Sequence, residues 1–585
     1  MKKKRTSPLK TLYTPWGETL DREHPLPEYP RPQMRRDSYL NLNGVWDYAI
    51  REDGRSPDVY DGEIVVPFSP ESPLSGVNRQ LMPDQTLWYR RTFRLPDGFH
   101  RDRVLLHFGA VDQEATVYLN GTEVGGHGGG YLPFSIDITE AVNDDENELR
   151  VRVTDVTDGS VYSYGKQKYD RGKIWYTAQS GIWQTVWLES VPDTYITDLT
   201  ITPCYDEGVV RLSITANQSY ARAAAQVYGD GELVAEGEID AQGQCRLPLG
   251  SNFRPWSPGD SYLYDLRIEA GSDEIESYFG MRKYSIIEHD GHRVLALNNK
   301  PYYQHGLLDQ GYWSDGLYTP PGDEAMIHDI RAMKEYGFNM LRKHIKIEPL
   351  RWYYHCDRLG MLVWQDMVSG GGPYRFSVIA GLPFIGVHLK DKWHRLFGRG
   401  DKAGRDQYER ECAGTVSHLY NCTSLCLWVP FNEGWGQFDA RRIARMVRAQ
   451  DPTRPIDHAS GWHDQGDGDL MSRHVYYRPV RLRNDGRVLA LTEFGGYSLP
   501  VPGHTASDTE FGYRIYRDGD AFMDALMDLY QREVIPLIAS QGLSASVYTQ
   551  VSDVEDEVNG LLTYDRRAAK GDPKRFRELS RKLSF

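Results

Sequence analysis

The sequence contains no long apolar run and no concentrated basic region. Its 585 residues include 68 lysines and arginines against 82 aspartates and glutamates, a formal charge of -14 at pH 7. Nucleic-acid binding needs a clustered basic face, whereas basic residues here lie among acidic ones except at residues 2–5, which we expect to form a solvated tail. No segment approaches the roughly 18 apolar residues that span a bilayer. We therefore expect neither a nucleic acid nor a membrane as partner.

Cysteines are few and show no paired framework. The six are Cys204, Cys245, Cys356, Cys412, Cys422 and Cys426. The last two form a C-x3-C pair without a second ligand pair nearby, so buried free thiols fit better than a structural zinc site. Residues 5–30 also lack the apolar core of a secretory signal. These features predict a cytoplasmic protein.

The chain is long and rich in aromatic residues. It contains 38 tyrosines and 14 tryptophans, with a hydrophobic fraction of 40%. One hydrophobic core rarely supports this length, so we expect two to four domains with aromatic-lined surfaces.

The first half of the chain has a β pattern. Alternating runs such as "LWYRRTFRL" and "ELRVRVTDV" predict a β-sandwich over residues 36–192, after an N-terminal extension at residues 1–35. A second all-β stretch, residues 193–287, has the length of one immunoglobulin-like sandwich. Its Asp230-Gly231 pair suits a hairpin turn.

Residues 288–585 alternate short buried runs with helical stretches. Eight such runs, among them "FNMLRKH", "MLVWQDM", "PIDHAS" and "SASVYTQ", predict a (β/α)8 barrel. A doubly wound open sheet is the alternative. No glycine-rich phosphate loop opens any of the helices, which favours the barrel.

Two glutamates close buried runs of this last domain. Glu433 follows "SLCLWVPFN" and Glu493 follows "VLALT", and the loops after the strands of a barrel build its active site. Paired carboxylates can cleave an acetal, one as acid and one as nucleophile or base. The alternative is that each is solvated or paired with an arginine. Asn432 and the glycines Gly495 and Gly496 beside them favour a ligand site.

Several motifs resemble one enzyme family. "LNLNGVWDY", "VYLNGTEVGGHGGGYLPF", "SGIWQTVWLE", "YFGMRKYSI", "FNMLRKH", "WVPFNEGWG" and "TEFGG" are together similar to glycoside hydrolase family 2, over about residues 40–566. That family includes β-galactosidases, β-glucuronidases and β-mannosidases. The resemblance implies a jelly-roll sugar-binding-like domain, an immunoglobulin-like domain and a TIM barrel that acts by a retaining double displacement. It implies no cofactor, and no acidic cluster matches the magnesium site of some relatives.

The resemblance also implies residue roles. Glu433 matches the acid/base, Asn432 the residue that bonds the sugar 2-hydroxyl, and Glu493 the nucleophile. An anionic Glu493 would raise the pKa of Glu433, so that Glu433 holds its proton until Glu493 is esterified.

Four further residues match the family more loosely. Arg342 and His344 lie in "LRKH", and Arg342 could fix the nucleophile or form a structural ion pair. His474 and Tyr476 lie at a strand end where relatives place a tyrosine that bonds the nucleophile. Tyr477 is the competing candidate.

Candidates for the sugar's 4- and 6-hydroxyls are Asp309, Gln310 and Asp366, each of which could equally cap a helix or lie on the barrel floor. The aromatic floor under the sugar is expected from Trp435, Trp313 or Trp462.

Relatives that cut glucuronides carry an Asn-x-Lys motif where this chain has Glu557 and Asn559. An acidic side chain there would repel a uronate, so we expect an exo-acting enzyme for a terminal neutral sugar, with a galactoside first and a mannoside or arabinopyranoside next. One alternative is a glucuronidase that neutralises its substrate with a residue such as Lys343, Lys346 or an arginine of residues 368–405. Another is a carbohydrate-binding protein without turnover.

Residues 368–405 form a long insertion after the third barrel strand. We expect it to wall the aglycone side with Tyr374, Phe376, Phe384, Trp393 and Phe397, or else to pack on a neighbouring subunit. A homo-oligomer whose second subunit completes the pocket is compatible with either.

Overall fold

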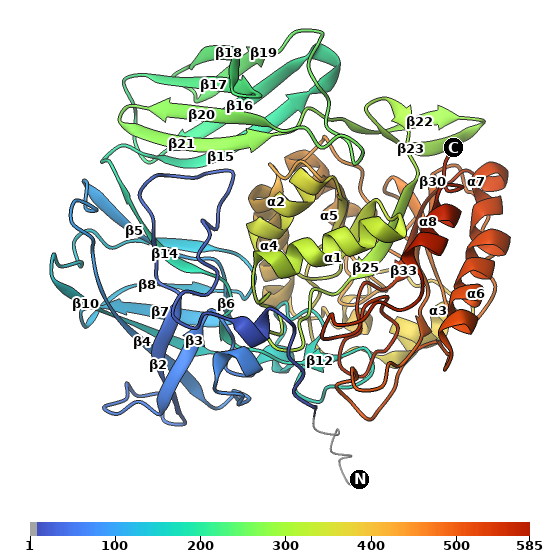
Figure 1. The fold of residues 1–585 in the computed structure, drawn as a ribbon, viewed down its shortest axis with the longest axis horizontal. Helices are drawn as coiled ribbons and strands as arrows, with labels where there is room; N and C mark the ends of the chain where they lie inside the picture. Colours follow the sequence, from blue (N-terminus) through green and yellow to red (C-terminus); the bar gives the residue numbers. More distant parts are fainter. Residues whose placement is uncertain (1–8) are drawn as a thin grey trace.

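The computed structural model describes residues 9–585 and contains the three predicted architectures. Figure 1 shows the N-terminal β-sandwich in blue at the left, the immunoglobulin-like domain in green at the top and the barrel in yellow to red at the right. The basic tip at residues 2–5 lies outside the described residues.

The N-terminal sandwich consists of two antiparallel sheets. The larger sheet runs in the order β3 (Gly62–Val66), β2 (Gly44–Arg51), β4 (Thr86–Arg94), β10 (Glu146–Thr154), β7 (Glu114–Leu119) and β8 (Thr122–Gly128). The smaller runs β1 (Leu40–Asn41), β14 (Val186–Val191), β5 (Arg103–Phe108) and β9 (Phe134–Asp137). Alternate residues of β10, including Leu149, Val151 and Val153, are buried between the sheets, as the period of two requires.

The immunoglobulin-like domain also has two sheets. One is β15 (Ile196–Cys204), β16 (Val209–Ala216) and β19 (Gln244–Pro248); the other is β18 (Glu232–Ile239), β17 (Ala223–Gly229), β20 (Tyr264–Ala270) and β21 (Asp273–Phe279). Asp230 and Gly231 join β17 to β18 with φ of 50° and 83°. Positive φ at both positions is what a two-residue hairpin turn requires, so the predicted turn is confirmed.

Seven parallel strands form the barrel sheet. Their order is β28 (Leu425–Val429), β27 (Leu362–Asp366), β26 (Met340–Lys343), β25 (Gln304–Asp309), β33 (Leu543–Thr549), β30 (Val488–Gly495) and β29 (Leu470–Val475). The predicted strand "PIDHAS", residues 455–460, lies between the two end strands as an extended segment. Asp457 N–H donates to the carbonyl of Trp428 (2.9 Å) and Asp469 N–H to that of Ile456 (3.0 Å). Eight extended segments therefore form the barrel, and one of them lacks a regular ladder of backbone hydrogen bonds.

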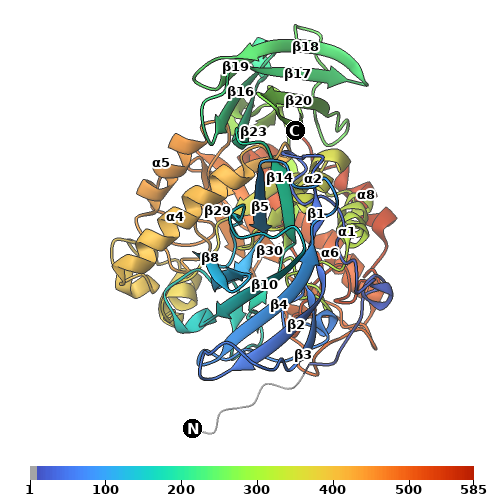
Figure 2. The same cartoon turned by 90° about the vertical axis from the view of Figure 1, so that its left-hand side faces the viewer.

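Helices cover the outside of this sheet (Figures 1 and 2). They are α1 (Asp323–Tyr336), α2 (Leu350–Leu359), α4 (Lys402–Leu419), α5 (Ala440–Gln450), α6 (Gly519–Leu529), α7 (Ile535–Gln541) and α8 (Pro573–Ser580). The connections on either side of β29 contain no helix, so the alternation of strand and helix is incomplete there. Within residues 9–585, no helix has the length and apolar character to cross a membrane.

A segment of the N-terminal domain lies against the barrel. Residues 161–180 connect β10 to β14 and contain the short parallel strands β11 (Gln167–Lys168) and β12 (Tyr176–Thr177). The N–H groups of Tyr164 and Gly165 donate to the carbonyl of Ser369, just beyond β27, at 3.0 and 2.9 Å. Thr177 N–H donates to Glu555 beyond β33 (2.8 Å). This segment, called the wall segment below, is thus bound to two strand ends of the barrel.

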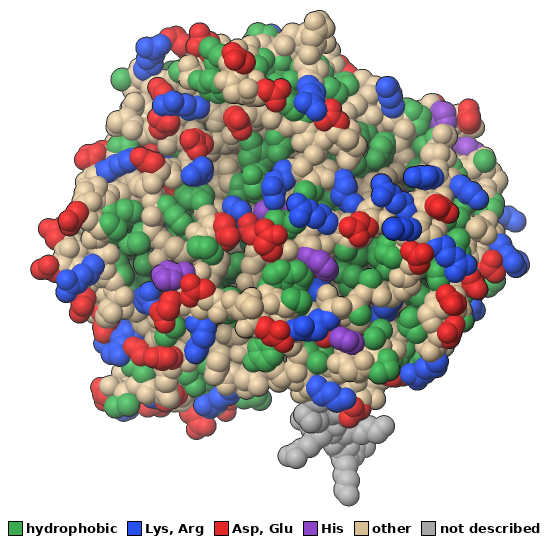
Figure 3. All heavy atoms as spheres, viewed as in Figure 1, with side chains coloured by type: hydrophobic (Ala, Val, Ile, Leu, Met, Phe, Trp, Pro, Cys, Tyr) green, Lys and Arg blue, Asp and Glu red, His purple; other side chains and the backbone are tan. Residues whose placement is uncertain are grey.

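Surface charge is mixed in sign. Figure 3 shows acidic and basic side chains interspersed on this face of the molecule, without a continuous basic region.

All six cysteines are free, and five of them are buried.

Candidate active site

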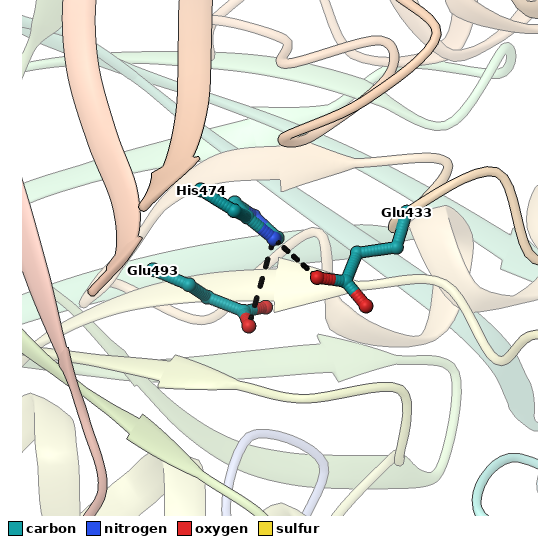
Figure 4. Close-up of side chains that lie close together, drawn as sticks. All are labelled: Glu433, His474 and Glu493. Carbon is teal, nitrogen blue, oxygen red and sulfur yellow. Dashed lines mark hydrogen bonds and ion pairs between the residues drawn. The ribbon is translucent and has the colours of Figure 1, made fainter. Parts of the chain in front are cut away.

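The structure brings Glu433 and Glu493 together. Glu433 lies just after β28 and Glu493 near the end of β30, so both carboxylates reach the same rim of the barrel. His474 at the end of β29 lies between them, with Nδ1 2.8 Å from Glu433 Oε1 and 3.6 Å from Glu493 Oε2 (Figure 4). Oxygens of the two glutamates come within 4.8 Å of each other.

The backbone around Glu433 explains the glycines beside it. Glu433, Gly434 and Gly436 have φ of 51°, 75° and 63°, in the left-handed region that disfavours side chains. A Cβ on Gly434 would lie 2.6 Å from the ring of His463, and one on Gly436 would lie 2.2 Å from the carbonyl of Gly370. The tight turn aims Glu433 into the site, and only glycine fits the close approaches that follow it.

Glu493 accepts two hydrogen bonds. Arg342 Nη1 donates to Oε1 (3.2 Å) and the hydroxyl of Tyr476 to Oε2 (2.8 Å). Tyr477 is 68% exposed and packs on Tyr513, so Tyr476 is the tyrosine that contacts this carboxylate. A guanidinium and a phenol that both donate to Glu493 stabilise its anionic form.

Glu433 lies in surroundings that favour the protonated acid. Burial raises its pKa to about 8, while the positive charges of Lys166 and Arg342 oppose that rise and Glu557 adds to it. The sequence argument assigned the rise to Glu493; the largest cause is desolvation, and Glu557 is an acidic neighbour that adds to it. Glu433 still holds a proton at neutral pH, for a different physical reason.

His474 is a neutral side chain between the two acids. Burial lowers its pKa to about 4. Its Nε2 faces Arg342 Nη1 (3.5 Å) and Ser460 Oγ (3.3 Å). Because Arg342 can only donate, this arrangement favours the tautomer with the proton on Nδ1, directed at the carboxylates.

Arg342 connects Glu493 to a second acidic group. It is fully buried and binds both oxygens of Asp366, at 2.9 and 3.1 Å. Asp366 also contacts His344 Nδ1 (2.7 Å) and has no exposed surface. The prediction that Asp366 bonds a sugar hydroxyl is therefore wrong, because both its oxygens are occupied beneath the site. The two roles left open for Arg342, nucleophile contact and structural ion pair, occur together.

Asn432 has a free donor. Its Oδ1 accepts from Arg342 Nη2 (2.8 Å), whereas its amide nitrogen has no hydrogen-bond partner among residues 9–585. An unpaired buried donor beside the acids suits a ligand hydroxyl.

The remaining polar candidates are paired with each other. Asp309 bonds Lys343 Nζ (2.7 Å), and Gln310 donates to Gln550 (2.7 Å). Glu557 accepts from the hydroxyl of Tyr176 and from Asn559 Nδ2 (3.2 Å).

Lys343 and Lys346, offered as cations for a uronate, both donate to Glu348 Oε1, at 2.8 and 2.9 Å. Because Lys343 also pairs with Asp309 (2.7 Å), the two lysines and these two carboxylates balance in charge.

The aromatic candidates separate into three groups. Trp435 lies 5.1 Å from Trp175 of the wall segment and 6.5 Å from Tyr374 of the insertion, centroid to centroid. Trp462 lies 6.1 Å from His474, so it also borders the site. Trp313 packs on Trp16 and beneath Arg566 instead, so the prediction that it forms the floor is not supported by its contacts.

Residues 368–405 reach the site only in part. Besides Tyr374, Phe384 packs 5.7 Å from Trp462. Phe376 and Trp393 are exposed. Phe397 is fully buried against His463, 5.0 Å away, so its predicted role as stacking surface is wrong.

Sequence reasoning missed the wall segment and Tyr513. Trp175, Tyr176 and Lys166 all border the site from the N-terminal domain. Tyr513 stacks on Tyr476 at 3.8 Å, and a Cβ on Gly496 would lie 2.3 Å from its ring. The one available signal was the aromatic and basic run "YSYGKQKYDRGKIWY".

One side-chain group in residues 9–585 offers converging metal ligands, namely Glu433, His474 and Glu493. Arg342, 3.2 Å from Glu493, places a fixed positive charge beside it. That charge disfavours a cation there.

Comparisons with known proteins agree with this architecture. Three family models match: "Glycosyl hydrolase 2 galactose-binding domain-like" over residues 70–184, "Glycosyl hydrolases family 2" over 194–282, and "Glycosyl hydrolases family 2, TIM barrel domain" over 290–481.

Curated relatives carry two different names. A β-galactosidase of Leuconostoc mesenteroides is 27% identical over 62% of this chain, but the match spans only 34% of that enzyme. A β-glucuronidase of Paenibacillus borealis is 24% identical over 80% of this chain and 85% of its own length. Among solved structures, Ruminococcus gnavus β-glucuronidase superposes with a TM-score of 0.74 at 17% identity, covering 95% of this chain and 99% of its own. That likeness shows the shared fold.

Proposed function

We propose, from the premise that the chain belongs to glycosyl hydrolase family 2, that it is an exo-acting retaining β-glycosidase. Glu493 would be the nucleophile and Glu433 the acid/base. The observation that carries the proposal is the separation of the two carboxylates, whose oxygens lie within 4.8 Å. Retaining glycosidases hold their carboxyl groups about 5–5.5 Å apart, whereas inverting ones leave about 6.5–9.5 Å for a water molecule.

In the first step, Glu493 attacks the anomeric carbon while the glycosidic bond breaks. The departing oxygen takes the proton of Glu433, whose burial keeps it protonated at neutral pH. The products are a glycosyl ester on Glu493 and a free alcohol, and Glu433 becomes a carboxylate.

In the second step, Glu433 takes a proton from water as the water oxygen attacks the anomeric carbon. The ester bond breaks, Glu493 leaves as a carboxylate and the sugar keeps its configuration. Arg342 and Tyr476, which donate to Glu493, stabilise the negative charge that returns to it. His474 Nδ1 faces both acids and can donate to whichever is anionic.

Asn432 would hold the sugar 2-hydroxyl through its free amide nitrogen. Asp309, Glu557 and Asn559 are candidates for the other hydroxyls. A neutral β-galactoside was expected from the acidic Glu557, and both oxygens of Glu557 accept hydrogen bonds, from Tyr176 and Asn559. These donors are neutral and leave the charge of Glu557 in place, so the repulsion argument is unchanged. A β-glucuronide is the second candidate, supported by the curated relatives of that name.

The decisive test replaces each glutamate by alanine. Glu493→Ala and Glu433→Ala should each abolish release of the aglycone from p-nitrophenyl β-glycosides. Azide should restore turnover in both, giving an α-glycosyl azide with Glu493→Ala and a β-glycosyl azide with Glu433→Ala, because azide replaces the nucleophile in one and the water in the other. Wild-type activity in either variant would contradict the assignment. Sugar binding without hydrolysis across the panel would instead indicate a carbohydrate-binding protein.

A further inference from the structure

Lys166 of the wall segment has an unusual environment. Four lysines in residues 9–585 are buried: Lys166, Lys343, Lys346 and Lys570. The last three each donate to a carboxylate, at 2.8, 2.9 and 2.5 Å. The ammonium of Lys166, whose residue is only 5% exposed, has no carboxylate or hydrogen-bond acceptor in contact among the described residues.

The backbone of Lys166 is fixed at the barrel rim. Its carbonyl accepts the N–H of Tyr176 (3.0 Å), and the preceding Gly165 donates to Ser369 beyond β27. A Cβ on Gly165 would lie 2.9 Å from the hydroxyl of Tyr318 and 3.0 Å from the carbonyl of Ile345, so the segment approaches the barrel closely. The position of the lysine is therefore set by the fold and does not depend on a free loop.

The side chain of Lys166 is directed into the candidate active site. Its ammonium lies 5.5 Å from the ring centroids of both Trp435 and Tyr176. Trp435 follows Glu433 by two residues, and the hydroxyl of Tyr176 bonds Glu557. The positive charge also acts on Glu433 and His344, whose pKa values it lowers. Lys166 thus stands on the rim between the acid/base and the loop that follows β33.

A buried cation without an anion is costly, and cation–π contacts offset only part of that cost. The acids nearest to it do not supply the missing charge. Glu433 holds its proton at neutral pH, and Glu557, whose oxygens accept hydrogen bonds from Tyr176 and Asn559, forms no ion pair with Lys166. The partner of this ammonium is therefore water or a group of the substrate.

We propose that Lys166 determines substrate specificity by binding an anionic oxygen group, a carboxylate or a sulfate ester, on the glycoside. This inference rests on the proposed glycosidase function and extends it to the class of substrate. The cation comes from the N-terminal domain, and the position of the family's glucuronide-binding lysine is occupied here by Asn559. A bound anion would also cancel the effect of Lys166 on Glu433, and so help Glu433 keep its proton when the matching substrate is present.

The test compares three p-nitrophenyl glycosides: the β-glucuronide, the β-galactoside 6-sulfate and the β-galactoside. The measured quantity is the ratio of kcat/KM for each anionic substrate to that for the neutral galactoside. Lys166→Met should lower the ratio for the recognised anion about 10- to 100-fold, mainly through KM, as expected for one lost charge-assisted hydrogen bond. The two anionic substrates distinguish carboxylate from sulfate.

Two further variants make the outcome specific. Lys166→Arg keeps the charge and should retain most of the preference. Lys168→Met is the matched control, because Lys168 lies in the same segment but has a partner in Asp158 (3.5 Å); its ratio should match the wild type. Equal losses on all three substrates with Lys166→Met, or no loss, would overturn the proposal, and equal losses would show that Lys166 only supports Glu433.

Failure of the glycosidase proposal would be visible separately. If the wild-type protein hydrolyses none of the three substrates, calorimetric titration with D-glucuronate, galactose 6-sulfate and galactose still decides the role of Lys166. Tighter binding of an anionic sugar by wild type than by Lys166→Met supports the role, and equal affinities contradict it.

Discussion

The floor and the wall of the candidate site are built on different principles. The floor consists of Arg342, Asp366, Asn432 and Glu493, all from the barrel strands or the turns that follow them, and almost every charge there has a partner within hydrogen-bond distance. The wall consists of Trp175 from the N-terminal segment and Tyr374 from the insertion, which pack in tilted or stacked contacts with Trp435 of the barrel, and of Lys166, whose ammonium lies over Trp435. The charges of the floor are paired with one another, whereas Lys166 in the wall has no charged partner among residues 9–585.

This difference indicates a division of labour. A compensated and rigid network can hold a nucleophile in one geometry through both chemical steps, which favours catalysis by preorganised charge. An aromatic surface with one uncompensated cation gains its partners from the substrate, which favours recognition. Floor variants should therefore act on kcat, and wall variants on KM and on the choice of substrate.

The largest effect is expected at the floor. Arg342→Met leaves Asp366 and Glu493 buried without their cation, so kcat should fall at least about 1,000-fold, and stability should fall by about 3–5 kcal/mol, as when one partner of a buried ion pair is removed. Steady-state kinetics and thermal unfolding measure both.

Arg454→Met is the control for Arg342→Met. Arg454 is equally buried and pairs with Asp451 (2.7 Å), but its Nε donates to the carbonyl of Leu425, at the start of β28 and away from the site. It should lose comparable stability while kcat per folded molecule stays within about three-fold, since stability loss alone does not alter transition-state contacts. Equal losses of kcat in the two variants would reduce Arg342 to a structural ion pair.

A smaller effect, confined to alkaline pH, should come from Glu433. Burial raises its pKa to about 8, and the acid must be protonated for the first step. The value of kcat/KM should therefore be level below pH 8 and fall about ten-fold per pH unit above it. In Glu433→Gln this alkaline limb should disappear from the residual activity. A limb that persists in Glu433→Gln would assign it to another group.

The smallest effect is expected at the wall. Trp175→Ala removes a ring that packs 5.1 Å from Trp435, so KM should rise about 5- to 20-fold, in the range of 1–2 kcal/mol for an aromatic contact, with kcat within three-fold. Trp393→Ala, on the exposed part of the insertion, should change neither constant. A loss of kcat in Trp175→Ala comparable to that of Arg342→Met would remove the distinction between floor and wall.

The floor could be predicted from the sequence better than the wall, because its residues lie in recognisable local sequence patterns. Glu433 and Glu493 each close a buried run, and parallel strands of a barrel bring such ends to one rim. The same pattern failed at Asp366, which also closes a strand. Only the three-dimensional structure shows that Arg342 and His344 cover it.

The wall could not be predicted in the same way. Lys166 and Trp175 lie more than 250 residues before Glu433 in a different domain. Their local sequence does not indicate which part of the barrel that segment contacts. Phe397 was predicted to lie on the surface of the insertion but is buried, because an aromatic residue in a long insertion can belong to the core as readily as to the surface. Contacts between domains depend on three-dimensional packing, which the periodicity of apolar residues along the sequence does not indicate.

The attack of Glu493 on the sugar is tested most directly by trapping the glycosyl ester. A 2,4-dinitrophenyl 2-deoxy-2-fluoro-β-glycoside should inactivate the protein, because fluorine slows both steps and the activated leaving group restores only the first. Mass spectrometry should then find one glycosyl group per chain, carried by the peptide that contains Glu493. A label on Glu433 or on any other residue, or turnover without an ester intermediate and with inverted configuration, would contradict the assignment of Glu493.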